Sequence, residues 1–207
     1  MKLKKMLAAT LAATMVMSSA MTVCASGYYD SSSESESTTV PEDVQVANAP
    51  VIVAGTSVRT SVAGVYAAKS VQGVAVTTSL TDLKKSLGLK DGQVAAITIY
   101  DTDLKKSSKA MDSINLIVDA MGAGTEVLTS LNVDLGAREN GKWVALEDGS
   151  VAMAAGLPKD ADLTKTFSVI CVQPGGVYEI LPDQDNNPAT VTFAVKAGIG
   201  TYAIVAQ

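Results

Sequence analysis

The stretch VTFAVKAGIGTYAIVAQ, residues 191–207, decides the fold class of this chain. Apolar side chains alternate with small or polar ones on both sides of a link that contains two glycines, and this period of two is typical of half-buried β-strands. Similar runs occur upstream, at 127–135, 143–146, 151–155, 167–172 and 177–181. Short strands separated by turns about every 8 to 12 residues predict an antiparallel sandwich or barrel.

The segment VLTSLNVDL, residues 127–135, gives the clearest strand pattern. It places Val127, Leu131, Val133 and Leu135 on one face and Ser130, Asn132 and Asp134 on the other. The following Asn140-Gly141 pair is a strong hairpin signal, because both residue types accept a positive φ. We expect WVAL, 143–146, to be the returning strand.

Two helices are expected in the first half. SLTDLKKSL, 79–87, begins with a capping box, and SSKAMDSINLIVDAMG, 107–122, carries an apolar stripe at steps of three and four residues that must cover a sheet. Between them, residues 94–101 are apolar on both faces, which is typical of a central strand. The predicted fold is therefore mainly β (α+β): an antiparallel sandwich in the C-terminal half, with one or two helices packed in the N-terminal half. A small α/β domain over 94–135 is the alternative.

The N-terminus predicts export. Met1 to Met6 contain three lysines and no acid, and an uncharged apolar run follows. This pattern is a secretory signal peptide over 1–25, with cleavage after Ala25. Two alternatives stay open: an uncleaved membrane anchor, and a lipid anchor through Cys24, although bulky Val23 precedes that cysteine. We expect a secreted, extracellular protein that does not insert into the membrane after cleavage.

Composition then divides the remaining chain. Residues 26–50 are rich in Ser, Thr, Glu and Asp and predict a flexible linker, whereas 51–126 and 127–207 are apolar enough to fold, as an N-terminal β/α region and a C-terminal β-sandwich module. Loss of residues 1–25 leaves 13 basic against 21 acidic side chains, a formal net charge of −8. Such a balance disfavours nucleic acid as a partner.

Residues 127–207 resemble a C-terminal β-rich module of secreted and surface proteins from Gram-positive gut clostridia. The matching elements are Leu157-Pro158, Phe167 with Val169, Gly175-Gly176, Val191-Thr192-Phe193 and Tyr202 to Val205. The resemblance implies an immunoglobulin-like sandwich and a surface location. Its motifs are structural, so it assigns no catalytic or binding residue.

Candidate catalytic groups are few. The chain has no histidine, which removes the histidine-dependent triads and the usual zinc sites. Cys171 lies in phase with Phe167 and Val169, so we expect a core thiol. Four acid pairs could be glycosidase carboxylates but occupy turn sequences: Asp101/Asp103, Glu147/Asp148, Asp160/Asp162 and Asp183/Asp185.

One of these pairs also belongs to a candidate ion site. Asp183, Asp185 and Asn187 have the alternate spacing that opens a calcium loop, but Pro188 and Ala194 replace the required Gly and Glu. We therefore expect no catalytic residue, no metal site and no cofactor.

The remaining candidates are two aromatic residues beside hairpin turns, Trp143 and Tyr178. Either could contact an extracellular glycan or protein, and packing within the hairpin is the alternative for both. The prediction is a secreted, non-enzymatic surface or interaction module. A glycan- or peptide-binding domain and a histidine-free hydrolase remain the alternatives.

Overall fold

A computed structural model describes residues 51–53 and 56–207 of this chain, and side chains from Arg59 onward. The predicted signal peptide, Cys24 and the predicted linker over 26–50 lie outside the described residues.

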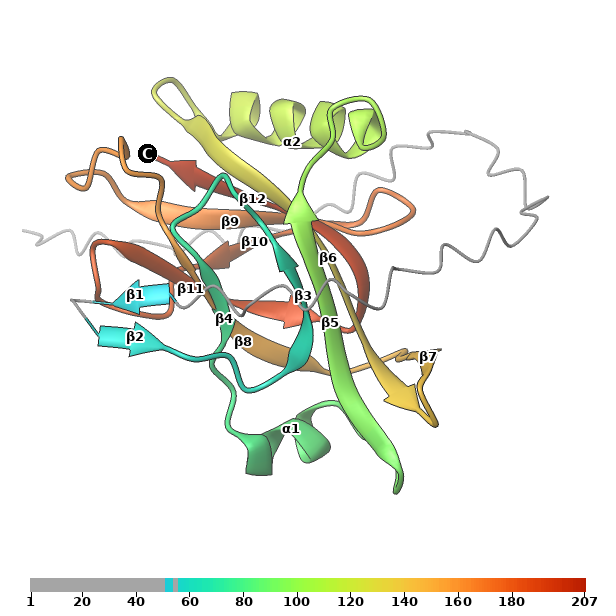
Figure 1. The fold of residues 1–207 in the computed structure, drawn as a ribbon. Coiled ribbons are helices and arrows are strands. Elements are labelled where there is room, and N and C mark those ends of the chain that lie inside the picture. Colours follow the sequence, from blue (N-terminus) through green and yellow to red (C-terminus); the bar gives the residue numbers. More distant parts are fainter. Residues whose placement is uncertain (1–50, 54–55) are drawn as a thin grey trace, which may run out of the picture.

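A seven-stranded sheet forms the larger layer (Figure 1). Its strands follow the order β10 (Tyr178–Pro182), β9 (Phe167–Val172), β12 (Gly198–Ala206), β6 (Glu126–Glu139), β5 (Gln93–Asp101) and β3 (Ala63–Ala67), and β7 (Lys142–Ala145) pairs with the end of β6. Among these strands only β3 and β5 pair in parallel. β5 and β6 are antiparallel neighbours, so residues 94–135 do not form the parallel unit of an α/β domain.

A smaller, antiparallel sheet forms the second layer. It consists of β11 (Thr190–Lys196), β8 (Ser150–Gly156) and β4 (Val74–Val76), and β11 contacts β6, β9 and β12 of the larger sheet. A short hairpin of β1 (Val51–Val53) and β2 (Thr56–Val58) lies beside β8. The expected mainly β sandwich is thereby confirmed.

The main core fills the space between the two sheets. Its largest fully buried members are Ile97, Ile99, Leu131, Leu135, Met153, Leu157, Phe193, Tyr202 and Ile204. The Phe193 and Tyr202 rings pack with centroids 5.6 Å apart. The apolar residues that alternate along 191–207 therefore face the core from two strands, β11 and β12.

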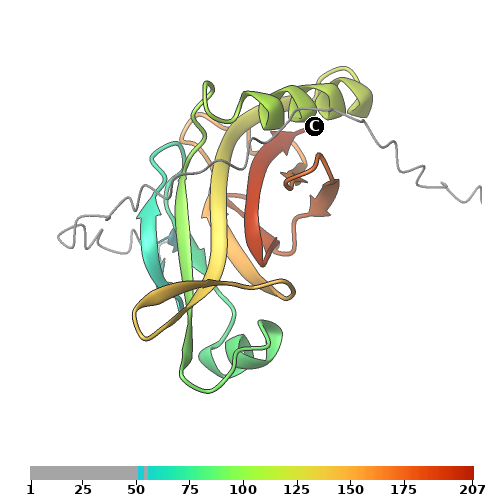
Figure 2. The same ribbon diagram turned by 90° about the vertical axis from the view of Figure 1, so that its right-hand side faces the viewer.

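The second helix covers part of the outer face of the large sheet. α2 (Ser108–Met121) buries Ile114 and Ile117 against Ile170 and Ala203, in a separate apolar cluster over β9 and β12. α1 (Leu80–Ser86) begins at Ser79, whose side chain accepts the Asp82 N–H, and it contacts β8. The two helices lie at opposite ends of the sandwich (Figures 1 and 2).

The register corrects the predicted position of Val127. A bulge between the pairs Ile204–Thr129 and Val205–Val127 shifts β6 by one residue. Because the side-chain period of a strand is two, this shift turns Val127 to the opposite face from Leu131, where it packs in the α2 cluster.

Two short turns between consecutive strands join the two sheets instead of closing hairpins. The turn over 147–150 leads from β7 in the large sheet to β8 in the small one, and one residue separates β11 from β12 in different sheets. The Tyr202 hydroxyl accepts the N–H of Lys196 at 3.0 Å and braces this second corner. By contrast, Asn140 and Gly141 adopt positive φ values of 51° and 78° and close the predicted β6–β7 hairpin.

Strands before and after residue 126, the predicted end of the N-terminal β/α region, belong to the same sheets. β3 and β5 extend the sheet that contains β6, β9 and β12, and β4 pairs with β8. α2 likewise packs on β9 and β12, which follow it in the chain.

Candidate functional site

The outer face of the large sheet is only partly covered by α2. The N-cap of α2 lies next to Asn132 on β6. The Asn132 side-chain amide donates to the Ser107 hydroxyl at that N-cap, and its side-chain oxygen accepts from the Thr201 hydroxyl. From Asn132 to Glu139 the same face of β6 continues beyond the helix.

This uncovered part carries exposed apolar side chains. The register aligns Tyr100 with Asn132, Thr98 with Asp134 and Ile199, Ala96 with Gly136, and Val94 with Arg138 and Trp143. Four large apolar members are strongly exposed: Val94 (63 %), Ile199 (58 %), Tyr100 (44 %) and Trp143 (40 %). We call this region the outer-face patch; it comprises those four residues with Thr98, Asp134 and Arg138.

Trp143 forms the end of the outer-face patch. Its indole lies over Gly136, where an added Cβ would stand 2.6 Å from the ring atom Cζ2. Gly136 thus provides space for a ring that is covered on one side by the sheet and open on the other. Trp143 therefore packs within the hairpin, which was the alternative that the sequence left open, and its ring is also substantially exposed.

Asp134 is the carboxylate of the outer-face patch. It is half-buried between Thr98 and Ile199, and no other residue that the structure describes bonds to its carboxylate. Burial raises the pKa of Asp134 above its ordinary value, because a carboxylate loses solvation there and gains no compensating donor. Sequence alternation placed Asp134 on the face opposite the core but did not indicate apolar neighbours.

Tyr178 lies apart from this patch. It is 51 % exposed on β10, the edge strand, and pairs with Val172 on the same outer face. The register separates it from Trp143 by two strand spacings and six residues of strand, roughly 20 Å. The two aromatic residues predicted as ligand contacts are therefore not brought together.

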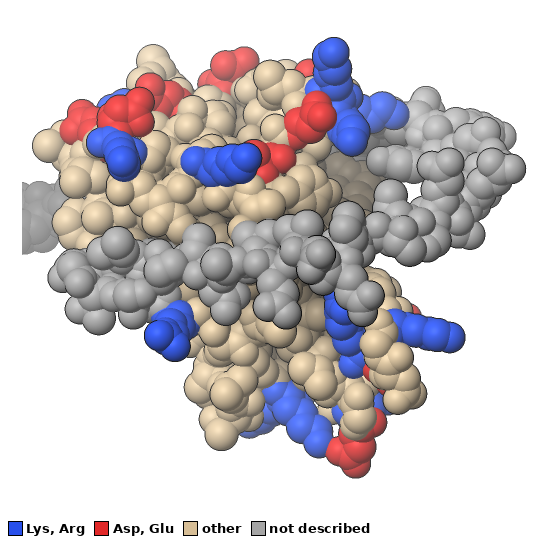
Figure 3. Space-filling view, viewed as in Figure 1, with Lys and Arg blue, Asp and Glu red and all other residues tan. Residues whose placement is uncertain are grey.

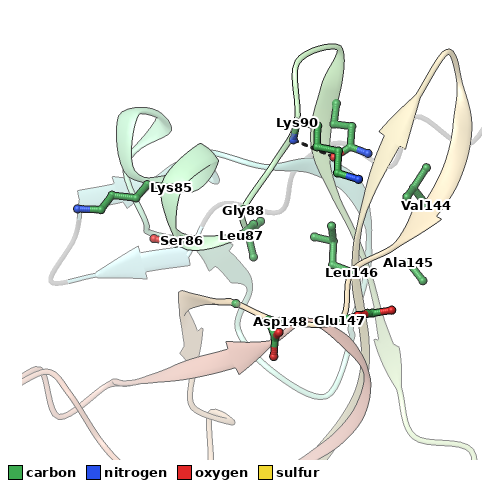
Figure 4. A pocket seen from close by; sticks show the side chains of 12 residues that line it. Lys85, Ser86, Leu87, Gly88, Lys90, Val144, Ala145, Leu146, Glu147 and Asp148 are labelled. Carbon is green, nitrogen blue, oxygen red and sulfur yellow. Dashed lines mark hydrogen bonds between the residues drawn. The ribbon is translucent and has the colours of Figure 1, made fainter.

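A shallow pocket of about 580 Å³ lies between the end of α1 and the β7–β8 turn (Figure 4). Leu87, Val144 and Leu146 contribute aliphatic surface to it. In Figure 4 the Lys85 side chain points away from the pocket, and Glu147 and Asp148 point in different directions. The charged groups thus do not converge on one ligand position.

The acidic turn over 183–187 uses its oxygens internally. Asp183 accepts the N–H groups of Asp185 and Thr192, Asp185 accepts both the Thr190 and Thr192 hydroxyls, and Asn187 accepts the Ala189 N–H. Within residues 51–53 and 56–207 no group of three His, Cys, Asp or Glu side chains is arranged to hold a metal ion. The carboxylates of this turn stabilise the β10–β11 connection.

Cys171 is a core thiol, as expected. It is buried in phase with Phe167 and Val169, and burial is the main cause that raises its pKa. A raised pKa and the absence of solvent contact make the thiol unreactive in the folded chain.

The surface around α2 carries both charge signs. Basic and acidic side chains lie side by side at the top of the face shown in Figure 3.

None of the helices that the structure describes has the length and apolar character needed to span a bilayer. Comparison of the chain with protein-family models, with curated proteins and with solved structures finds no match.

Proposed function

We propose that this chain is an extracellular, non-enzymatic interaction module that binds its partner on the outer-face patch. The observation that carries the proposal is the group of exposed apolar side chains that β5, β7 and β12 place around β6, next to the end of α2. Contiguous exposed apolar surface on a folded domain is typical of an interaction site. A solvated sheet face would instead alternate apolar inward and polar outward residues.

The apolar outward residues of β5 support this proposal. Val94 and Tyr100 do not belong to the described core. At these exposed positions a polar side chain would favour solubility without loss of core packing. The sequence pattern that predicted a strand buried on both faces is explained if a partner covers the second face.

A glycan ligand is a second candidate, favoured by one observation. The exposed ring of Trp143 lies over Gly136, and Asp134, two residues from Gly136 on the same face of β6, is an acceptor for sugar hydroxyls. The surrounding Val94 and Ile199 side chains provide no aromatic stacking surface, which is why a protein partner is preferred.

Location and fold family belong to the same proposal. The signal-peptide pattern of residues 1–25 supports secretion, with the lipid anchor at Cys24 as the alternative. The two facing sheets, with β8 and β11 opposite β6, β9 and β12, support an immunoglobulin-like relationship for residues 127–207.

Trp143 makes the proposal directly testable because it is the only tryptophan of the chain. Proteins from bacterial culture medium and host mucus are captured on the immobilised full chain, identified, purified and titrated against it. We expect a bound partner to shift the tryptophan emission to shorter wavelength, and the double variant Val94→Ser/Ile199→Ser to lose capture while its thermal unfolding stays cooperative. Partners that bind this variant as well as the wild type would refute the assignment of the site.

A further inference from the structure

The charge distribution of the outer-face patch indicates what its partner carries. Asp134 is flanked by the uncharged Thr98 on β5 and Ile199 on β12. On β6 its neighbours on the same face are Asn132 and Gly136; Ala145 of β7 pairs with Gly136, and the Trp143 indole lies over Gly136. The acid therefore stands alone among neutral groups.

Arg138, the nearest described cation on this face, does not neutralise the Asp134 carboxylate directly. Arg138 is four residues further along β6, about 13 Å away along the strand, and no ion pair joins it to Asp134. A partner that covers the patch removes the remaining water from the Asp134 carboxylate. Such a buried charge is unfavourable unless a cation or several donors replace the water.

A purely apolar partner would leave this carboxylate unpaired. A sugar hydroxyl would give it one neutral hydrogen bond, whereas a Lys or Arg side chain would give it a charge-assisted one. The indole of Trp143, about 7 Å along the strand from Asp134, would in addition lie beside the alkyl chain of such a residue.

We propose that the outer-face patch binds an apolar protein segment that places a Lys or Arg side chain against Asp134. The inference rests on the proposed function and names the chemistry of its partner. From Val94 to Tyr100 the patch spans seven residues of β5, about 20 Å, which accommodates an extended segment of about seven residues. Val94 and Tyr100 then contact the apolar residues on either side of the basic one, and Ile199 lies beside it.

The experiment is selection of a random peptide display library on the full chain. We expect the enriched peptides to share one Lys or Arg flanked by aliphatic or aromatic residues. For the best peptide, Asp134→Asn should raise the Kd at least about tenfold, because a neutral amide no longer pairs with the cation. The same substitution should change the Kd less than about twofold for a counterpart peptide with norleucine in place of its basic residue.

Two further variants separate the explanations. Asp112→Asn removes an exposed acid of α2 outside the patch and should leave both peptides unaffected. Trp143→Ala should weaken both peptides, and circular dichroism verifies that each variant is folded.

Three results would overturn the inference: no enriched peptide, enrichment without a basic residue, or equal effects of Asp134→Asn and Asp112→Asn. A panel of soluble oligosaccharides is measured in parallel. If an oligosaccharide alone binds, and Trp143→Ala abolishes this binding, the inference fails whereas the interaction-module proposal stands. If a partner captured from culture or mucus binds independently of Val94 and Ile199, the proposed site itself fails.

Discussion

The indole of Trp143 lies directly over Gly136, so that a Cβ at Gly136 would stand 2.6 Å from Cζ2 of the ring. The two residues belong to adjacent strands of the β6–β7 hairpin, where Gly136 pairs with Ala145 and Trp143 with Arg138. Because Gly136 has no side chain, the indole can lie against β6 at this position.

The first prediction follows from this contact. Gly136→Ala should displace the indole, shift its emission to longer wavelength and destabilise the chain by about 1–3 kcal/mol through overpacking. Combined with Trp143→Ala, the same substitution should cost less, because the ring is no longer in the way. Purely additive effects in chemical denaturation would contradict the contact.

The Asp101 carboxylate anchors the loop after β3. It accepts the N–H groups of Lys69 and Ser70 and the Ser70 hydroxyl at 2.6–3.0 Å. Partial burial opposes its ionisation, but these hydrogen bonds hold the pKa of Asp101 below its usual value. Asp101→Ala should therefore cost about 1–3 kcal/mol at pH 7.

The pH dependence of this effect has a definite sign. A depressed folded-state pKa stabilises the protein above the unfolded pKa, about 3.9, and this contribution is lost as the pH falls through the folded value. Urea denaturation of wild type and Asp101→Ala at pH 7 and pH 3 should show a smaller difference at pH 3. A difference that does not depend on pH would mean that the carboxylate charge is unimportant.

Tyr66 should promote alkaline unfolding above about pH 10. Burial raises its pKa to about 12, and its hydroxyl donates to the Val62 carbonyl at 2.6 Å. Because the folded pKa exceeds the unfolded value of about 10, the stabilisation is complete below pH 10 and falls by about 2 kcal/mol as the pH approaches 12.

Absorbance at 295 nm measures this titration. Of the six tyrosines, Tyr66 and Tyr202, whose pKa burial also raises, should ionise only above the unfolded value of about 10. Tyr66→Phe should remove one of these two late-titrating groups. Ionisation of Tyr66 near pH 10 in the folded chain, seen as an unchanged high-pH step in the Tyr66→Phe variant, would contradict the burial.

The thiol of Cys171 should be inert until the sandwich unfolds. In a Cys24→Ser variant of the full chain, a thiol reagent such as DTNB should react with less than one tenth of the thiols at pH 8 without denaturant, and completely in denaturant. Cys171→Ser should cost about 1–3 kcal/mol because it buries a hydroxyl. Rapid reaction under native conditions would show that β9 opens to solvent.

The acidic β10–β11 turn should respond to mutation but not to calcium. Asp185→Ala leaves the hydroxyls of Thr190 and Thr192 without their acceptor and should cost about 1–3 kcal/mol. Millimolar calcium should leave the Tm of the wild type unchanged, since the same oxygens already accept protein donors. A calcium-dependent rise in Tm that Asp185→Ala abolishes would contradict this role.

Local sequence information predicted the secondary structure well. The period of two located β9 to β12, and the capping box at Ser79 located α1. It could not locate the bulge that turns Val127 to the outer face, because a one-residue shift depends on how β6 pairs with β12. Nor could it distinguish hairpin turns from turns that cross between sheets.

For the candidate site the sequence indicated Trp143 but not its surroundings. Val94 and Tyr100 had the pattern of a strand buried on both faces, but α2 packs over β9 and β12 and leaves the outer side of these two residues exposed. The association of Asp134 with Ile199 joins residues of two strands far apart in the chain.

The sequence by itself determined the period, polarity and turn chemistry of each segment, because these depend on neighbouring residues along the chain. Only the tertiary structure decided which strands pair and which apolar face stays uncovered, because strand order and helix placement depend on contacts between distant segments. The outer-face patch is a product of that second step: β5, β6, β7 and β12 contribute its residues, and it exists only in the assembled sheet.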